Sequence, residues 1–193
     1  MRLDILNRGY RPGTRLLFAV IRLVSRHPVP DAAKLVFYRP DFYGSRSKEF
    51  THAAMRGPSP WSVGDRELMA AYVSQVNESA FCIGAHSATA RQAYRDGPKV
   101  AAVLADLESA PVEDGLRATL RMLGKLTRQG TADAADMRQV LAAGVSRQQV
   151  TDALAVCAAF NTTNRLADAF GFEVLSRDGF EAGARYLLKR GYQ

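Results

Sequence analysis

Apolar residues recur every three or four positions along almost the whole sequence, and this spacing predicts a chain built from helices. Stretches that alternate apolar and polar residues are scarce and alanine is abundant, so strands are not expected. Residues 112–128 show the pattern clearly, because Leu116, Leu120 and Leu123 fall on one side of a helix. We therefore expect an all-α fold, a multi-helix bundle of about nine or ten helices joined by short loops.

Start and stop signals divide this periodic sequence into separate helices. Ser62 with Asp65, and Ser146 with Gln149, form capping boxes, in which two residues satisfy each other's free backbone N–H groups. The run Asp96-Gly97-Pro98 is expected to be a break after a helix. The expected helices span residues 14–26, 31–39, 42–55, 62–76, 79–94, 100–107, 112–128, 133–142, 146–170 and 177–189.

The net charge of +7 arises mainly at the start of the 193-residue sequence. Before residue 30 the only acidic residue is Asp4, and the arginines there are Arg2, Arg8, Arg11, Arg15, Arg22 and Arg26. A basic helical arm explains this distribution as well as nucleic-acid binding does, and we do not expect a nucleic-acid partner. We divide the chain into a basic helical arm, residues 1–40, and a helical domain, residues 41–193. The apolar stripe of the arm is expected to pack on a neighbouring subunit.

Two features of the sequence favour a cytoplasmic protein. The two cysteines, Cys82 and Cys157, are too few for the disulfide framework of a small secreted protein. The apolar run from Leu16 to Ile21 is too short to cross a bilayer, and no secretory signal pattern is evident. We expect a reducing cytoplasmic compartment and no membrane span.

Cys82 and His86 are four residues apart, in the stretch that places a nucleophile beside a base. On a helix this spacing puts the thiol and the imidazole on the same face, about one turn apart. The turn-like residues 77–79 precede them, so Cys82 is expected in the first turn of a helix, where free N–H groups and the helix dipole favour a thiolate. A neighbouring imidazole favours the same ionisation. The pair therefore predicts a reactive cysteine.

The residues around this pair resemble a known family. The block from Glu67 to His86, with the run Asn77-Glu78-Ser79-Ala80-Phe81-Cys82, is similar to the alkylhydroperoxidase D / carboxymuconolactone decarboxylase family, and most of all to its peroxidase-related branch. That family carries a Glu, then a Cys-x-x-Cys pair, then a His four residues after the second Cys. The stretch 160–168 resembles the closing helix of the family, and the resemblance covers roughly residues 45–175.

The resemblance implies a role for each matched residue. Cys82 stands at the second cysteine and would attack a peroxide, His86 would act as base and then as acid, and Glu67 would orient His86 and relay its proton. Ser79 stands where the family has its first cysteine, so no disulfide can close within the motif. The resemblance also implies a helical bundle of the alkylhydroperoxidase D type that forms a homo-oligomer, either a trimer or a dimer of trimers.

The serine at position 79 changes what the site needs. As the N-cap residue, Ser79 would accept the N–H of residue 82, or it would donate its hydroxyl proton to the thiolate, and either role supports an ionised Cys82. A sulfenic acid formed on a single cysteine must be restored by an external thiol or by a second cysteine of the protein. Cys157 is the only internal candidate, and its apolar neighbours indicate a packing role.

Other interpretations are open at each position. Cys82 could be a small buried apolar residue, Glu67 could be a surface carboxylate, and Ser79 could be a helix cap alone. Glu67, Cys82 and His86 could supply three metal ligands, but nothing supplies a second shell, and we expect neither a metal nor a cofactor. The leading function is a thiol-dependent peroxidase, an antioxidant oxidoreductase of the peroxiredoxin kind. The alternatives are a decarboxylase or isomerase that acts on a small organic acid, and a non-catalytic member retained for binding or assembly.

Overall fold

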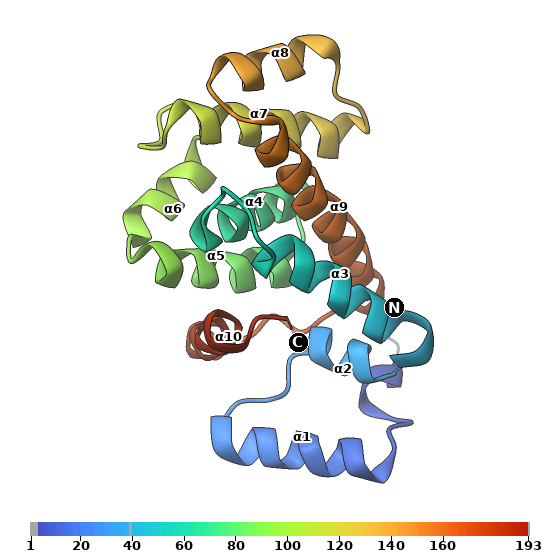
Figure 1. Ribbon diagram of the computed structural model, residues 1–193. Helices are drawn as coiled ribbons and strands as arrows, with labels where there is room; N and C mark the ends of the chain where they lie inside the picture. The colour runs from blue at the N-terminus through green and yellow to red at the C-terminus, as the bar shows by residue number, and fades with distance from the viewer. Residues whose placement is uncertain (1–3, 39, 193) are drawn as a thin grey trace.

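The structure is a computed structural model that describes residues 4–38 and 40–192. These residues form ten α-helices, whose arrangement Figure 1 shows, and the all-α fold expected from the sequence is confirmed. The helices are α1 (Pro12–Ser25), α2 (Asp31–Tyr38), α3 (Ser45–Arg56), α4 (Val63–Val76), α5 (Ala80–Tyr94), α6 (Gly97–Ala105), α7 (Asp114–Gln129), α8 (Ala134–Ala142), α9 (Arg147–Phe170) and α10 (Arg177–Arg190). A 3-10 turn (Asp4–Asn7) precedes α1, and a π-helical turn (Pro40–Gly44) precedes α3. None of the described helices is long and apolar enough to cross a membrane.

The capping boxes expected from the sequence begin two of the central helices. The Ser62 hydroxyl accepts the Asp65 N–H at 3.0 Å, the Asp65 carboxylate accepts the Ser62 N–H at 2.9 Å, and α4 begins at the next residue. Ser146 and Gln149 pair in the same way before α9, at 3.1 and 2.9 Å. Both predictions are confirmed, so local sequence decides where the helices that frame the site begin.

Several helix boundaries differ from expectation by two or three residues, and the starts of α6 and α3 are two of them. The run Asp96-Gly97-Pro98, expected as a break, is the start of α6, because the Asp96 carboxylate accepts the N–H of Lys99 at 3.0 Å. Proline fits there because its missing N–H would have no partner in the first turn of a helix. Residues 40–44 form the π-helical turn, so α3 begins at Ser45 rather than at residue 42.

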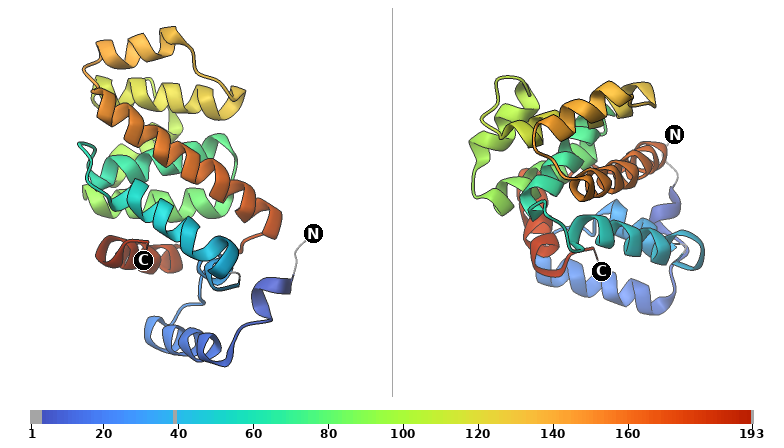
Figure 2. Two further views of the ribbon diagram at one scale, coloured as in Figure 1. Left: turned by 45° about the vertical axis from the view of Figure 1, so that its right-hand side comes forward. Right: turned by 45° about the horizontal axis from the view of Figure 1, so that its top comes forward.

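α4 is the central helix of the bundle and packs against α5, α7 and α9 (Figures 1 and 2). Its residues Leu68, Met69 and Val73 are fully buried and join residues of α7 and α9 in the larger of two buried apolar clusters. The smaller cluster lies where α5 meets α10. Its members include Leu35, Phe81, Cys82, Phe172, Phe180 and Ala184. The candidate thiol is therefore part of a small core that is separate from the one around α4.

α5 and α10 approach each other closely at Gly84. A Cβ atom at this position would lie 2.4 Å from Cε2 of Phe180, which leaves no room for a side chain. The rings of Phe81 and Phe180 meet across the same contact, with centroids 5.9 Å apart. The glycine therefore allows α10 to lie directly against the helix that carries Cys82 and His86.

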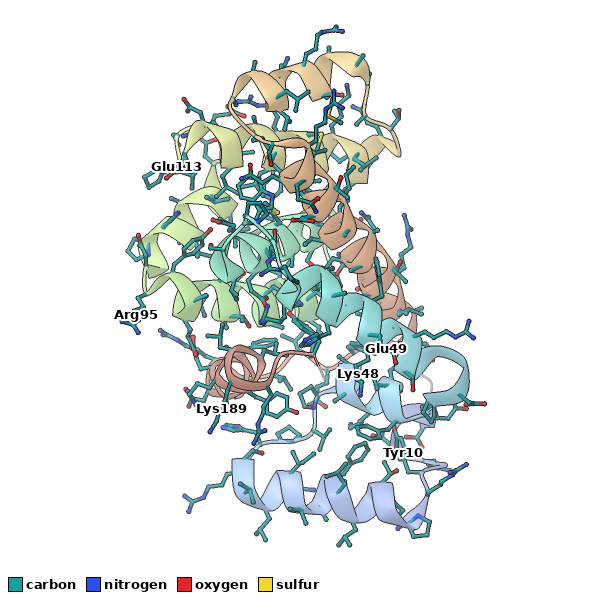
Figure 3. All side chains as sticks on the ribbon, viewed as in Figure 1. Tyr10, Lys48, Glu49, Arg95, Glu113 and Lys189 are labelled. Carbon is teal, nitrogen blue, oxygen red and sulfur yellow. The ribbon has the colours of Figure 1, made fainter. Side chains whose placement is uncertain are left out.

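Within the basic arm, α1 has no buried residue, whereas Leu6 and Leu35 of the same segment are buried in the smaller cluster. Phe18 packs on Tyr10 and Phe37, with ring centroids 5.0 and 5.4 Å away, and Tyr10 lies between α1 and the rest of the bundle (Figure 3). α1 lies at one end of the molecule, away from α7 and α8 (Figure 2). An apolar stripe, exposed by 40% to 80%, consists of Leu16, Leu17, Val20, Leu23 and Val24. This stripe faces away from the described bundle.

Gly84→Ala is expected to destabilise the protein by about 1–3 kcal/mol, since the new methyl group overlaps the Phe180 ring and must push α10 away. Chemical denaturation measures the change in the free energy of unfolding. Gly183→Ala on α10 is the matched control, because nothing lies within 4 Å of a Cβ there and alanine should stabilise the helix by about 0.5–1 kcal/mol. Equal effects of the two substitutions would contradict the close contact.

Candidate functional site

The turn between α4 and α5 decides where Cys82 lies. Glu78 takes a left-handed backbone conformation with φ of +58°, and Ser79 follows as the extended N-cap residue of α5. The Ser79 N–H donates to the Ser74 carbonyl at 3.0 Å, which closes the turn. Cys82 consequently lies in the first turn of α5, as predicted.

Glu67, on α4, is a fully buried carboxylate with three hydrogen-bonding partners. Oε1 accepts from Arg56 Nη2 at 2.6 Å and from the Tyr192 hydroxyl at 2.9 Å, and Oε2 lies 2.7 Å from His86 Nδ1. Burial by itself would raise the pKa of Glu67, but the hydrogen bonds and charges of His86 and Arg56 outweigh it and hold this pKa below its ordinary value. Glu67 is therefore ionised at neutral pH, and the surface position considered for it is wrong.

His86 is held through its Nδ1 atom and by two aromatic rings. Because Nδ1 faces the ionised Glu67, the tautomer with its proton on Nδ1 is favoured, and Nε2 carries the lone pair. The imidazole meets the Phe160 ring edge-on at 4.3 Å and stacks with the Tyr192 ring at 6.4 Å between centroids. Within the described residues Nε2 has no hydrogen-bonding partner, so it is the atom free to exchange a proton.

Cys82 is 1% exposed, and its environment disfavours the thiolate. Burial raises the pKa of Cys82 to about 12; a hydrogen bond from Ser79 acts against this shift, and the charge of Asp168 adds to it. No hydrogen bond joins the sulfur to His86 in the part of the chain that is described. The expectation that the helix terminus and His86 keep Cys82 ionised is therefore wrong for this conformation, because loss of water around the sulfur outweighs both effects.

Ser79 is the N-cap residue of α5 but does not cap the helix with its side chain. Its hydroxyl donates to Asp168 Oδ1, on α9, at 2.9 Å, so the expected bond with the N–H of residue 82 is not made. The other expected role, support of the thiolate, fits the hydrogen bond that lowers the pKa of Cys82. Because a hydroxyl has one proton to donate, Asp168 and the sulfur compete for it.

Cys157 lies in the larger cluster, away from the cluster that contains Cys82. Its sulfur is 3.6 Å from Thr127 Oγ1 and accepts from Asn161 Nδ2 at 3.2 Å. Burial raises the pKa of Cys157, and the two hydrogen bonds offset only part of this increase. These contacts agree with the packing role expected from its neighbours in the sequence.

Arg56 and Tyr192 belong to the site although no sequence pattern indicates them. Arg56 is the last residue of α3 and Tyr192 follows α10, so both reach Glu67 only through the tertiary fold. The Arg56 guanidinium also donates to the carbonyls of Met55 and Leu187, at 2.8 and 3.2 Å, which holds its planar group in place. Among the residues that the structure describes, no group of three or more His, Cys, Asp and Glu side chains is arranged to bind a metal ion.

The helical bundle resembles solved structures of peroxidase-related proteins. An uncharacterised peroxidase-related protein from Silicibacter sp. TM1040 aligns with a TM-score of 0.79 and 24% identity, over 93% of this chain and 94% of that one. A second, from Ralstonia eutropha JMP134 and described as an alkylhydroperoxidase AhpD core, aligns with a TM-score of 0.76 and 20% identity, over 90% of this chain and 91% of the other. The similarity establishes the fold as a helical bundle of the alkylhydroperoxidase type. A search of curated proteins found no match.

The sequence itself matches a family over its central part. Residues 43–125 fit the model of the Carboxymuconolactone decarboxylase family, and this stretch contains Glu67, Ser79, Cys82 and His86. This match confirms the family resemblance recognised around Cys82.

Glu67→Gln should lower stability near neutral pH, and this loss should shrink in acid. Because the pKa of Glu67 is lowered in the folded protein, its contribution to stability is present above the unfolded carboxyl pKa of about 4.3 and disappears as the pH falls through the lowered value. Urea unfolding of both proteins, from neutral pH down to about pH 3, which lies well below the unfolded carboxyl pKa, measures the difference. A difference that stays constant over this range contradicts an ionised Glu67 paired with His86 and Arg56.

Proposed function

We propose that the protein is a peroxidase-related thiol oxidoreductase that uses Cys82 as its single reacting cysteine. The proposal is supported above all by the Glu67–His86 pair, a buried and ionised carboxylate bound to an imidazole one helical turn from the thiol. Side chains of a helix lean toward its N-terminus, so the His86 imidazole leans toward Cys82. A carboxylate that orients a histidine beside a thiol is the arrangement of an acid–base relay.

The relay acts when a peroxide or a water bridges the sulfur and His86 Nε2. Nε2 takes the thiol proton, the thiolate attacks the nearer peroxide oxygen, and the O–O bond breaks as the S–O bond forms. The departing alkoxide takes the proton from His86 and leaves as the alcohol, so Cys82 becomes a sulfenic acid. Glu67 stabilises the transient imidazolium, and the Ser79 hydroxyl supports the thiolate. Since the pKa of the resting Cys82 thiol is about 12, the thiol loses its proton only after the substrate has bound.

The oxidised cysteine requires a reductant from outside the chain. One external thiol condenses with the sulfenic acid to give a mixed disulfide and water, and a second thiol releases Cys82 and leaves as the external disulfide. Ser79 cannot form a disulfide, and Cys157 lies in the other cluster, so neither replaces this reductant. A reducing cytoplasm, which supplies thiols of this kind, is the proposed compartment.

A second function is proton transfer on a small organic acid, as in a decarboxylase or an isomerase. It is favoured because the Glu67–His86 pair is complete without the thiol, and because burial raises the pKa of Cys82 to about 12. His86 would then exchange a proton with the substrate, and Cys82 would only pack. Alkylation of Cys82 separates the two functions, since it leaves proton-transfer turnover intact and abolishes peroxide reduction. A non-catalytic role in binding or assembly predicts neither activity.

One equivalent of peroxide should convert Cys82 to its sulfenic acid, which dimedone trapping and peptide mass spectrometry detect. Cys82→Ser should abolish peroxide reduction. Ser79→Ala should slow it by about 10- to 100-fold, the effect of losing one hydrogen bond to a charged group. Cys157→Ser, in the other cluster, is the matched control and should keep its activity. If no sulfenic acid appears on Cys82, the thiol mechanism is wrong.

We also propose that the protein is a homo-oligomer, a trimer or a dimer of trimers, in which α1 packs on a second copy of the chain. The apolar stripe of α1 is exposed in the single chain, and an exposed apolar face of this kind marks a protein interface. The helical spacing of Arg15 and Arg22 places them away from the stripe, so the face that meets the second copy is uncharged.

Leu16→Asp combined with Leu23→Asp should shift the protein toward smaller assemblies, because each substitution places a charge in the apolar stripe. Sedimentation velocity measures the distribution of species. Arg15→Gln combined with Arg22→Gln changes the charge of the same helix outside the stripe and should leave the assembly intact. Unchanged sedimentation of the aspartate variant would remove α1 from the interface.

A further inference from the structure

The groups that would react in this site are all closed to solvent. Glu67 is 0% exposed, Cys82 is 1% exposed and His86 is 5% exposed. A small molecule can therefore reach the Cys82 sulfur only if a residue that covers the site moves. Among the described residues, the hydrogen bonds and ring contacts that reach the imidazole or its carboxylate from outside α4 and α5 come from Arg56, Phe160 and Tyr192.

Tyr192 is the least constrained of these three covering residues. Arg56 and Phe160 are parts of α3 and α9, where the backbone hydrogen bonds of a helix hold them. Tyr192 follows α10 and lies outside the helices. Its backbone N–H donates to His52 Nδ1 at 3.3 Å, which is longer than the usual range for such a bond. Tyr192 can therefore move without disturbing a helix.

Gly191 is the residue at which the chain after α10 turns back toward the site. Its φ of +70° lies in the left-handed region, which favours glycine. A Cβ atom there would lie 2.8 Å from Cε1 of His52 and 3.2 Å from Cγ of Arg56. A residue with a side chain would be strained by the backbone conformation and would collide with α3, so the position of Tyr192 depends on this glycine.

Tyr192 covers the relay with its hydroxyl and with its ring. The hydroxyl donates to Glu67 Oε1 at 2.9 Å and lies 3.4 Å from His86 Nδ1. The ring lies nearly parallel to the imidazole, at 16°, and the Arg56 guanidinium carbon is 5.1 Å from the ring centroid. Burial, and then the charge of Glu67, raise the pKa of Tyr192 well above its ordinary value, so the phenol keeps its proton and stays a donor. Tyr192 also packs against the edge of the larger apolar cluster.

We propose that Tyr192 is a gate over the Glu67–His86 pair, and that rotation about Gly191 lifts its phenol from this pair and opens a path into the site. When the phenol returns, its hydroxyl and Arg56 again occupy Oε1 of Glu67, which leaves Oε2 for His86. Tyr192 is thus a positioning residue in the closed state and a cover that a substrate must displace. The gate deepens the proposed function by assigning its access route, and it rests on that function for the nature of the molecule that enters.

Carbethoxylation of histidines by diethylpyrocarbonate, followed by peptide mass spectrometry of the full chain, tests the gate. Tyr192→Ala removes the cover and should raise the rate of modification at His86 by about tenfold or more, because the open state of a gated site is typically populated at about 10% or less. Tyr192→Phe keeps the ring and loses only the hydroxyl bond, so its increase should be smaller. His27, in the segment between α1 and α2, is the internal reference and should keep its wild-type rate.

Gly191→Ala reaches the open state by another route, because its Cβ meets His52 and Arg56 and forces the chain at Tyr192 away from the site, although the Tyr192 side chain is unchanged. It should also raise the rate at His86. An unchanged rate at His86 in both Tyr192→Ala and Gly191→Ala overturns the gate. An equal rise in the modification rates of His86 and His27 also overturns the gate, because it shows that the substitution has destabilised the whole protein. The modification needs neither Cys82 nor a peroxide, so loss of the proposed function leaves this result interpretable.

Discussion

The buried negative charge of Glu67 is the interaction on which the site and the packing around it depend. Removing a carboxylate from water costs several kcal/mol unless partners replace the lost hydration. Arg56, His86 and Tyr192 replace it here, and they come from α3, from α5 and from the segment after α10. A single carboxylate on α4 therefore joins four parts of the chain, and the loss of any partner leaves the others beside a charge that is poorly compensated.

The acid–base and the nucleophilic parts of the site have opposite electrostatic environments. Polar partners surround Glu67 and lower its pKa, whereas apolar packing surrounds Cys82 and raises its pKa to about 12. For the proposed oxidoreductase, this contrast means that Glu67 already orients His86 as a base while the Cys82 thiol stays protonated. A protonated and buried thiol resists unplanned oxidation, since the thiolate is the form that reacts.

Sequence predicts this structure well where the determinants are local. The apolar spacing indicates the helices, and the capping boxes at Ser62 and Ser146 mark the starts of α4 and α9, because a cap requires only residues three positions apart. Local reasoning fails where a distant residue competes, as when Asp168 takes the Ser79 hydroxyl from the helix terminus. The family resemblance around Cys82 is enough to identify residues that lie within the family match. Arg56 and Tyr192, the partners of Glu67, can be identified only from the three-dimensional structure.

The division of the apolar interior into two clusters has a consequence for how the molecule fluctuates. The larger cluster is built mainly around α4, α7 and α9, whereas the smaller one gathers residues of α5 and α10, with Leu35 of α2 and Ala167 of α9, around Cys82. A local opening that separates α10 from α5 exposes the smaller cluster while the larger one stays closed. The part of the protein around Cys82 can therefore open locally while the rest stays folded. The amide hydrogens of α10 should then exchange with solvent sooner than those of α4.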